Sequence, residues 1–347
     1  MSKNITLKDI AKRAGVSYQT VSKVIHNQMQ VTPAVRARIQ AAIEELDYRP
    51  NAAAQNLRTQ SSHLIGYSWK LERQNYFSPI LEQFQHSLVE CAEGFGYHIL
   101  LFPHRTDRDL YATYEELVRT RRVDGFILSS VEYNDARIAS LERLNVPFVS
   151  FGRSNTESVS PYVDVDGREG IAQAVRHLIE QGHQRIAILA WPEGSRVGAE
   201  RLAGYWAAME EAELTIDPKW VVRGKGEMDY GYEAATALLD LPEKRRPTAI
   251  VTVIDTIAIG VIQAAEACGH MVGRDLAVTG FDDMPVAHYI KPGLTTLRQP
   301  IWDVGRTVIH LLIDFLKEEP PIESHILLSP ELLVRESSLG YVRPQHD

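Results

Sequence analysis

Residues 6–25 carry two short helical patterns separated by a glycine. Apolar side chains recur at the spacing of one helix face in each pattern: Leu7, Ile10, Ala11 and Ala14 in the first, and Val21, Val24 and Ile25 in the second. Thr6 and Ser17 are suited to cap the two helices, Asp9 stands where a capping acid belongs, and Gly15 is suited to end the first helix. Two short helices joined by a tight turn predict a helix-turn-helix, with two ordinary surface helices of a bundle as the alternative.

The side of the second helix that faces away from its apolar residues is polar. Tyr18, Gln19 and Lys23 can form hydrogen bonds there, and a hydrophobic core does not need them. Such a face fits the major groove of DNA, where Gln19 suits adenine and Lys23 suits guanine. Three further residues are better assigned to phosphates, which position a protein without reading the sequence: Ser17, Asn27 and Arg36.

A third helix and a short fourth segment follow. Thr32 and Pro33 form a cap and a first-turn proline, and the apolar residues after them would close a three-helix core: Val35, Ile39, Ile43 and Leu46. The segment after Pro50 permits a helix of about two turns, which is too short to persist alone in water. We therefore expect it to form only when DNA and a second copy of the chain hold it.

Charge divides the chain into two parts. Residues 1–60 contain nine lysines and arginines against four acids, a net charge of +5. Since the whole chain carries −8, the remaining residues carry −13. A basic head on an acidic body is the distribution expected when only the head meets phosphates. The length of 347 residues indicates two or three folding units.

From Leu64 onward, apolar β-rich runs alternate with amphipathic helical stretches. The strands we expect are Leu64–Tyr67, His98–Phe102, Gly125–Leu128, Phe148–Phe151, Tyr162–Val165, Arg185–Leu189, Trp220–Val222, Ala249–Val253 and Leu276–Gly280. Alternation of this kind predicts parallel sheets covered by helices on both faces. Because so many strands exceed one small sheet, we expect two doubly wound lobes.

Ligands of parallel sheets bind beyond the carboxyl ends of the strands, so the residues just after each strand are candidates for a site. These are Ser129, Arg153, Trp191, Asp255 and Asp282, and Arg201 lies on the helix after Trp191. Charged groups bind hydroxyls directionally and aromatic faces cover C–H surface, so the set suits a polyhydroxylated ligand. Taken alone, the residues favour a structural bridge between Arg201 and Asp282, with the aromatic side chains in the core.

Other functional classes lack their residue patterns. The chain has no G-x-G-x-x-G, P-loop, nucleophile elbow or H-E-x-x-H motif, so we expect neither an enzyme nor a cofactor. Cys91 and Cys268 are far apart and provide neither a disulfide framework nor a metal site. Because no signal-peptide pattern and no membrane-spanning run is present, we expect a cytoplasmic protein that does not contact a membrane.

The segments LKDIAKRAGVSYQTVSKVIH (residues 7–26) and RPNAAAQNL (residues 49–57) resemble the head and hinge of the lactose-repressor/galactose-repressor (LacI/GalR) family of transcription regulators. The resemblance implies an all-α helix-turn-helix head and an α/β periplasmic-binding-protein-like core of two doubly wound parallel-sheet lobes. It also implies a homodimer that binds a near-palindromic operator in double-stranded DNA, and a small-molecule effector bound between the lobes.

The implied domains are a helix-turn-helix at 1–48, a hinge helix at 49–61, an N-terminal lobe at 62–161 and 299–328, a C-terminal lobe at 162–298 and 329–340, and a tail at 341–347. The chain would cross between the lobes near Ser160, Arg298 and Ser329. The tail contains no leucine heptad, so no tetramerising coiled coil is expected.

The family pattern also assigns roles to single positions. Arg201 in AERLAG and Asp282 in GFDD stand where the family binds effector, and Tyr76 and Phe77 align with an aromatic pair that lines the pocket in several members. Leu57 stands at the hinge leucine that wedges into the minor groove, and Ala54 lies one turn before it. Three positions, among others, depart from the pattern: Lys23 replaces a common arginine, Trp191 replaces a common glycine, and Ile254 replaces a common asparagine whose amide would contact ligand.

We therefore expect a regulator, most simply a repressor, whose operator affinity is controlled by a sugar or small glycoside. A purine- or nucleoside-type corepressor and a non-regulatory sugar-binding protein are the alternatives. An inducer and a corepressor use the same architecture, so the sign of the response is not readable from the sequence.

Overall fold

The computed structural model describes residues 5–25, 31–48, 56, 61–70, 78–104, 110–155 and 159–340. The chain divides into two compact units, a head that ends at Ser62 and a body that begins at His63. Each unit has hydrophobic clusters of its own. Asn27, Ala54, Leu57, Tyr76 and Phe77, which the sequence assigns to DNA or effector, lie outside the described residues.

The head contains three helices, α1 (Leu7–Ala14), α2 (Tyr18–Ile25) and α3 (Pro33–Glu45). Asp9 accepts hydrogen bonds from the backbone N and the hydroxyl of Thr6, at 2.9 and 2.7 Å, and so begins α1 with a capping box. Gly15 ends α1 with φ of 64°, a left-handed conformation that glycine adopts without strain. Ile10, Val21 and Ile39 are buried at the centre of the head, as the helical periodicity predicts.

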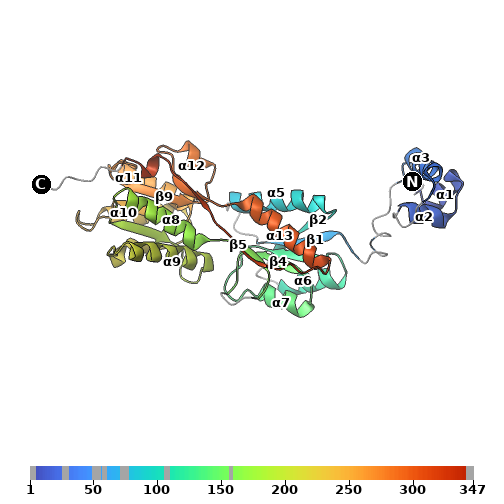
Figure 1. Ribbon diagram of the computed structural model, residues 1–347. Coiled ribbons are helices and arrows are strands. Elements are labelled where there is room, and N and C mark those ends of the chain that lie inside the picture. The colour runs from blue at the N-terminus through green and yellow to red at the C-terminus, as the bar shows by residue number, and fades with distance from the viewer. Residues whose placement is uncertain are drawn as a thin grey trace. The chain divides into compact units, whose positions relative to one another are not determined.

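The described part of the body contains two six-stranded sheets, seen as separate lobes in Figure 1. The first sheet has the order β11-β5-β4-β3-β1-β2, with β1 Leu64–Lys70, β2 His98–His104, β3 Gly125–Leu128, β4 Phe148–Phe151, β5 Tyr162–Val165 and β11 His325–Leu328. The second has the order β12-β10-β9-β8-β6-β7, with β6 Ile186–Ala190, β7 Val221–Arg223, β8 Ala249–Thr252, β9 Ala277–Phe281, β10 Thr295–Arg298 and β12 Glu331–Leu333. Every strand pair is parallel except β10 with β12.

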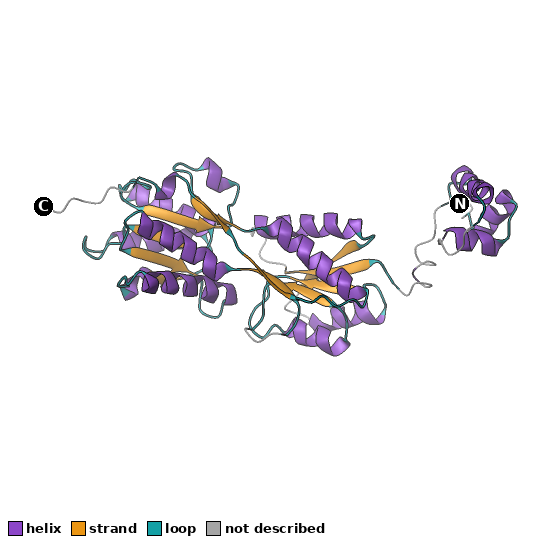
Figure 2. Cartoon of the chain, in the orientation of Figure 1, coloured by secondary structure: helices purple, strands orange, loops and turns teal. Residues whose placement is uncertain are grey.

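Helices cover both faces of the first sheet, which we call the N-terminal lobe (Figure 2). The helices of this lobe are α5 (Pro79–Gly94), α6 (Leu110–Arg119), α7 (Ala136–Leu144) and α13 (Ile301–Leu316). Phe84 of α5 and Val308 of α13 pack with Ile127, whereas Tyr114 of α6 packs with Phe126, the neighbouring residue of β3. Because successive side chains of a strand point to opposite faces, the two helix pairs lie on opposite sides of the sheet.

The second sheet belongs to the C-terminal lobe. Its helices are α8 (Gly167–Glu180), α9 (Arg196–Glu211), α10 (Met228–Leu239), α11 (Asp255–Ala267) and the short α12 (Val286–Tyr289), with 3-10 turns at Pro218–Trp220 and Glu336–Ser338. Helix α8 packs beside α9, and α10 packs beside α11. A single cluster of buried apolar residues joins them to fully buried strands such as Ile186–Ala190. Two parallel sheets covered in this way confirm the predicted fold class.

The expected assignment of residues 162–165 to the C-terminal lobe is wrong. β5 (Tyr162–Val165) pairs with β4 and β11 in the sheet of the N-terminal lobe, and the chain crosses only after it, before α8. The reason is that β5 fills the space between two strands of that sheet, a non-local pairing that the apolar run does not reveal. The other crossings come between β10 and α13, and between β11 and β12.

Several elements escaped the sequence prediction. β10, β11 and β12 are absent from the expected strands. Edge strands β11 and β12 are short and partly exposed, so they lack the continuous apolar pattern of central strands. In the described ranges, no helix is long and apolar enough to cross a bilayer.

Candidate functional site

The predicted DNA-reading face of the head is exposed. The Tyr18 side chain is 49% exposed, and Gln19 and Lys23 are also exposed on α2. The hydroxyl of Ser17 accepts a hydrogen bond from the backbone N of Thr20 at 3.1 Å, which makes Ser17 the cap that the sequence predicts. Arg36 is exposed on α3. The head therefore presents polar and basic side chains from α2 and α3 that no residue of its core requires.

Both lobes have the same strand order around their first strand, and this order marks the carboxyl edge where ligands of such sheets bind. In the N-terminal lobe β1 lies between β2 and β3, and in the C-terminal lobe β6 lies between β7 and β8. The helices that follow β1 and β3 cover opposite faces of the first sheet, and those that follow β6 and β8 cover opposite faces of the second. A buried arginine lies near each of these two points: Arg137 of α7 donates to the carbonyl of Ser129, just after β3, and Arg201 of α9 donates to the carbonyl of Val253, just after β8.

Arg201 of α9 is 5% exposed and lies beyond the ends of β8 and β9. One terminal nitrogen donates to the carbonyl of Val253, and another lies 3.8 Å from Oδ1 of Asp282. The guanidinium carbon stacks 3.6 Å from the ring centre of Phe281 and lies 5.1 Å from that of Trp191. The Nε of Arg201 is buried and has no hydrogen-bond partner among the described residues.

Asp282 follows β9 in a left-handed conformation, with φ of 110°. Gln299 donates a hydrogen bond of 2.6 Å to its Oδ1. Burial raises the pKa of the Asp282 carboxyl to about 6, although Arg201 and Gln299 act in the opposite direction. The carboxyl is therefore close to titration near neutral pH, and its contact with Arg201 is loose.

Asp255, which the sequence places among the effector residues, has a different role in this structure. Its side chain is fully buried, and its two oxygens accept hydrogen bonds from Thr296 at 2.5 Å and from the backbone N of Met284 at 2.7 Å. Burial raises the pKa of its carboxyl, and the charge of Asp282 adds to the increase. Asp255 therefore ties the loop after β9 to α11, and its contact with an effector stays a prediction.

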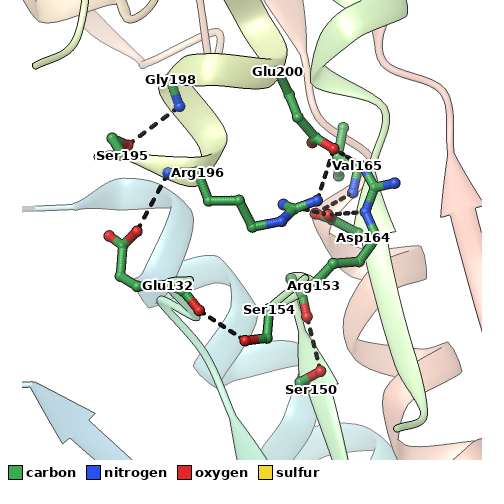
Figure 3. Close-up of polar contacts among 11 residues, drawn as sticks. Glu132, Ser150, Arg153, Ser154, Asp164, Val165, Ser195, Arg196, Gly198 and Glu200 are labelled. Carbon is green, nitrogen blue, oxygen red and sulfur yellow. Dashed lines mark hydrogen bonds and ion pairs between the residues drawn. The ribbon is translucent and has the colours of Figure 1, made fainter. Parts of the chain in front are cut away.

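Arg153, which follows β4, takes part in a ring of ion pairs with Asp164, Arg196 and Glu200 (Figure 3). Nε of Arg153 lies 2.9 Å from Asp164, and a terminal nitrogen of Arg153 lies 2.6 Å from Glu200. Arg196 lies 3.3 Å from the same oxygen of Asp164 and 2.7 Å from the same oxygen of Glu200. We call these four residues the ion-pair ring. Arg153 and Asp164 belong to the N-terminal lobe, and Arg196 and Glu200 to the C-terminal lobe.

The carboxyl edge of the N-terminal lobe is filled by its own polar groups. Arg137 pairs with Asp135 through two hydrogen bonds, from Nε to Oδ1 at 2.9 Å and from a terminal nitrogen to Oδ2 at 2.6 Å. It also donates to the carbonyl of Ser129 at 2.9 Å. The hydroxyl of Ser129, a predicted effector residue, is 2.7 Å from that of Tyr67. The Ser129 side chain is thus buried and engaged within the lobe.

Trp191 follows β6 and is partly buried, as a residue at the edge of a site should be. A Cβ on Gly198 would lie 2.9 Å from Cβ of Trp191, and a Cβ on Gly226 would lie 2.9 Å from its Nε1. These two glycines therefore make room for the indole, which replaces the family's glycine.

Sequence reasoning missed Arg137, the partner of Asp135. It also missed Asp164, Arg196 and Glu200, which form the ion-pair ring with Arg153. One signal was available, because an acid within the apolar strand Tyr162–Val165 needs a partner. The spacing of four between Arg196 and Glu200 was a second signal. Among the described residues, no group of three histidines, cysteines or acids could hold a metal ion.

Comparisons with known proteins agree with this arrangement. A family model for bacterial regulatory proteins of the lacI family matches residues 6–51, and one for a periplasmic binding protein-like domain matches residues 175–338. An HTH-type transcriptional repressor PurR from Proteus mirabilis (strain HI4320) is 34% identical over 335 residues, covering 96% of each chain.

Two solved structures are similar over almost the whole chain. A transcriptional regulator CelR–cellobiose complex is 31% identical with a TM-score of 0.73, and the match covers 96% of this chain and 99% of that chain. The lac repressor dimer bound to operator and the anti-inducer ONPF is 28% identical with a TM-score of 0.81, covering 97% and 100%. The chain therefore belongs to the LacI family of DNA-binding transcription regulators, not to a class of enzymes, and carries its effector domain in the body.

Proposed function

We propose that this regulator is a repressor that binds a near-palindromic operator as a homodimer, and that a sugar or small glycoside bound between the lobes controls its operator affinity. Support for the dimer and the operator comes from the similar lac repressor structure, which is a dimer bound to operator. The basic head supports DNA as the partner, since its charge of +5 contrasts with −13 in the rest of the chain.

The unpartnered Nε of Arg201 is the observation that carries the effector proposal. It is buried at the carboxyl edge of the sheet, between Phe281 and Trp191, with the loosely held Asp282 beside it. A hydroxyl of a ligand can accept from Arg201 and donate to Asp282, while the C–H face of a pyranose can cover the indole of Trp191. The related CelR structure is a complex with cellobiose, which supports a saccharide.

Charge balance favours an uncharged ligand. The three arginines at the facing edges of the lobes are matched by three acids: Arg153, Arg196 and Arg201 by Asp164, Glu200 and Asp282. A phosphate or a carboxylate on the ligand would have to displace one of these acids from its arginine. A neutral sugar would leave the pairs intact, so we expect sugar phosphates to bind more weakly than neutral sugars.

In the head, we propose that Tyr18, Gln19 and Lys23 contact base edges and that Ser17 and Arg36 contact phosphates. Three residues outside the described ranges complete this proposal: Asn27 at a phosphate, and Ala54 and Leu57 in the minor groove. The effector would change the spacing of the two hinge segments of the dimer. Such a coupling is typically about 1–3 kcal/mol and is reciprocal between ligand and DNA.

A thermal-shift screen tests the ligand class directly. Neutral mono- and disaccharides, sugar phosphates and nucleobases are compared at equal concentration, and we expect only neutral saccharides to raise the melting temperature. Arg201→Met should abolish the shift, and Glu169→Gln should retain it because Glu169 pairs with Arg176 in a partly exposed ion pair within the C-terminal lobe. A shift with nucleobases alone, or one retained by Arg201→Met, would overturn the proposal. Operators selected from a random duplex library, with and without the hit, then report its effect on DNA affinity.

A further inference from the structure

We propose that the ion-pair ring is a latch that holds the two lobes of the body together in one relative orientation. The latch concerns only the lobes of the body, and the proposal does not depend on which ligand class the effector belongs to. It makes closure of the lobes an electrostatic property of the chain itself, sensitive to salt.

Two of the four ring contacts cross from lobe to lobe. Arg153, at the end of β4, reaches Glu200 of α9 at 2.6 Å. Asp164, on β5, receives Arg196 of α9 at 3.3 Å. A further contact crosses nearby, since the backbone N of Arg196, in the first turn of α9, donates to Glu132 at 3.4 Å. Glu132 lies in the loop after β3 of the N-terminal lobe, so its negative charge faces the positive end of the α9 dipole.

The other two contacts stay within one lobe. Arg153 pairs with Asp164 at 2.9 Å in the N-terminal lobe, and Arg196 pairs with Glu200 at 2.7 Å one helical turn along α9. When the lobes separate, every charge therefore keeps one partner. The large cost of leaving a buried charge alone does not arise, so the ring can open and close reversibly.

The ring is shielded enough for its crossing contacts to have a measurable effect. The Arg196 and Asp164 side chains are 4% and 9% exposed, and those of Arg153 and Glu200 are 16% and 24% exposed. Ion pairs on open surfaces are strongly screened by water, whereas these are largely withdrawn from it. Burial also raises the pKa of the Glu200 carboxyl, against the effect of Arg196 and Arg153, consistent with partial removal from solvent.

The arrangement across the interface is that of two opposed dipoles. Each lobe presents one positive and one negative group, and each group faces the opposite charge on the other lobe. Closure in this register joins unlike charges. A shift of the lobes by one group would set either Arg153 against Arg196 or Asp164 against Glu200, depending on its direction. The latch thus selects one lobe orientation, which is the quantity that a hinged regulator must control.

The test measures the distance between the lobes in the full-length protein without effector. Spin labels are attached to the single native cysteine of the C-terminal lobe, Cys268, and to Thr113→Cys on α6, both exposed positions, in a Cys91→Ser background. Labelled chains are diluted with an excess of unlabelled cysteine-free chains so that only distances within one chain are recorded. Pulsed electron resonance then yields the distribution at low and high salt.

We expect one dominant short distance at low salt that gives way to longer distances at high salt. Arg153→Met and Glu200→Gln should each lower the ratio of closed to open chains about tenfold, and the double variant should add little to either single change. Glu169→Gln is the matched control, because it removes an ion pair with Arg176 inside the C-terminal lobe. If the distances between the lobes and their salt dependence are the same in Glu200→Gln as in the control Glu169→Gln, the ring is not a latch.

Discussion

The two lobes share a strand order but treat their buried arginines in opposite ways. In the N-terminal lobe, Arg137 is bound on all sides by its own lobe, through Asp135 and the carbonyl of Ser129. In the C-terminal lobe, Arg201 keeps a buried Nε without a partner among the described residues and meets Asp282 only at 3.8 Å. A buried arginine at the carboxyl edge of a sheet is thus satisfied in one lobe and left with hydrogen-bonding capacity in the other.

The acids beside the two arginines differ in the same way. Burial alone would raise the pKa of Asp135, but the hydrogen bonds and charge of Arg137 outweigh it and lower that pKa. For Asp282, burial outweighs the opposing effects of Arg201 and Gln299 and raises the pKa to about 6. The N-terminal pair is a completed structural unit, and the C-terminal pair is a site with capacity for a ligand.

The largest effect on stability is expected when the pair of Arg137 and Asp135 is broken. Arg137→Met leaves Asp135 as a buried carboxylate without its cation, which costs about 3–5 kcal/mol of unfolding free energy. Arg201→Met should cost less, because Asp282 can become neutral near pH 6. Denaturant unfolding of the two variants, at pH 7 and in parallel, measures the difference. Equal losses would show that both arginines are structural, and the comparison between the lobes would then fail.

The second-largest effect is a change of stability with pH, and it comes from Asp282 in its pair with Arg201. Asp282 has a folded pKa near 6 against an ordinary value of 3.8. The folded state therefore retains a proton that the unfolded chain has released, so this group stabilises the fold most at low pH, and that contribution is lost as pH rises through 6. The difference between the two pKa values corresponds to at most about 3 kcal/mol of unfolding free energy.

Effector binding should show the opposite trend, because it needs the charged carboxylate of Asp282 as an acceptor. Affinity should be constant above about pH 7 and fall about tenfold per unit well below pH 6. Calorimetric titration with the hit of the saccharide screen, from pH 5 to pH 8, measures this fall. Asp282→Asn removes the titrating group, so a profile in this variant parallel to that of the parent would assign the titration to another residue.

Sequence patterns predicted the elements whose causes are local. The capping box of Thr6 and Asp9, the left-handed Gly15 and the cap of Ser17 each depend on residues within a few positions, and each is found as expected. The central strands were also predicted closely, because strands buried on both faces are continuously apolar. β5 was predicted as a strand but assigned to the wrong lobe, because its partners β4 and β11 are set by non-local pairing.

The candidate site was predictable where single positions follow a strand or match the family pattern. Arg201 and Asp282 were singled out in both ways, and they lie together. The ion-pair ring was not predicted, since its members come from the ends of β4, from β5 and from α9, and nothing in the sequence specifies that these segments meet. The contacts of Asp255 were not predicted, because a residue after a strand can turn into the protein as readily as outward, and here its carboxylate accepts hydrogen bonds from Thr296 and Met284.

The smallest effect on stability is expected in the head. It shows that the distance between two charges does not by itself determine how much an ion pair stabilises the fold. Arg13 of α1 lies 2.6 Å from Glu45 of α3, closer than Arg201 to Asp282, but the two side chains are 56% and 52% exposed. Water screens them in the folded state and solvates them equally well when separated, so Glu45→Gln should change stability by less than about 1 kcal/mol. Hydrogen exchange of the amides in α1 and α3 measures this locally in the full chain. A loss of stability comparable to that of Arg137→Met would mean that the distance between the charged atoms matters more than their burial. The difference between the arginines of the two lobes would then need another cause.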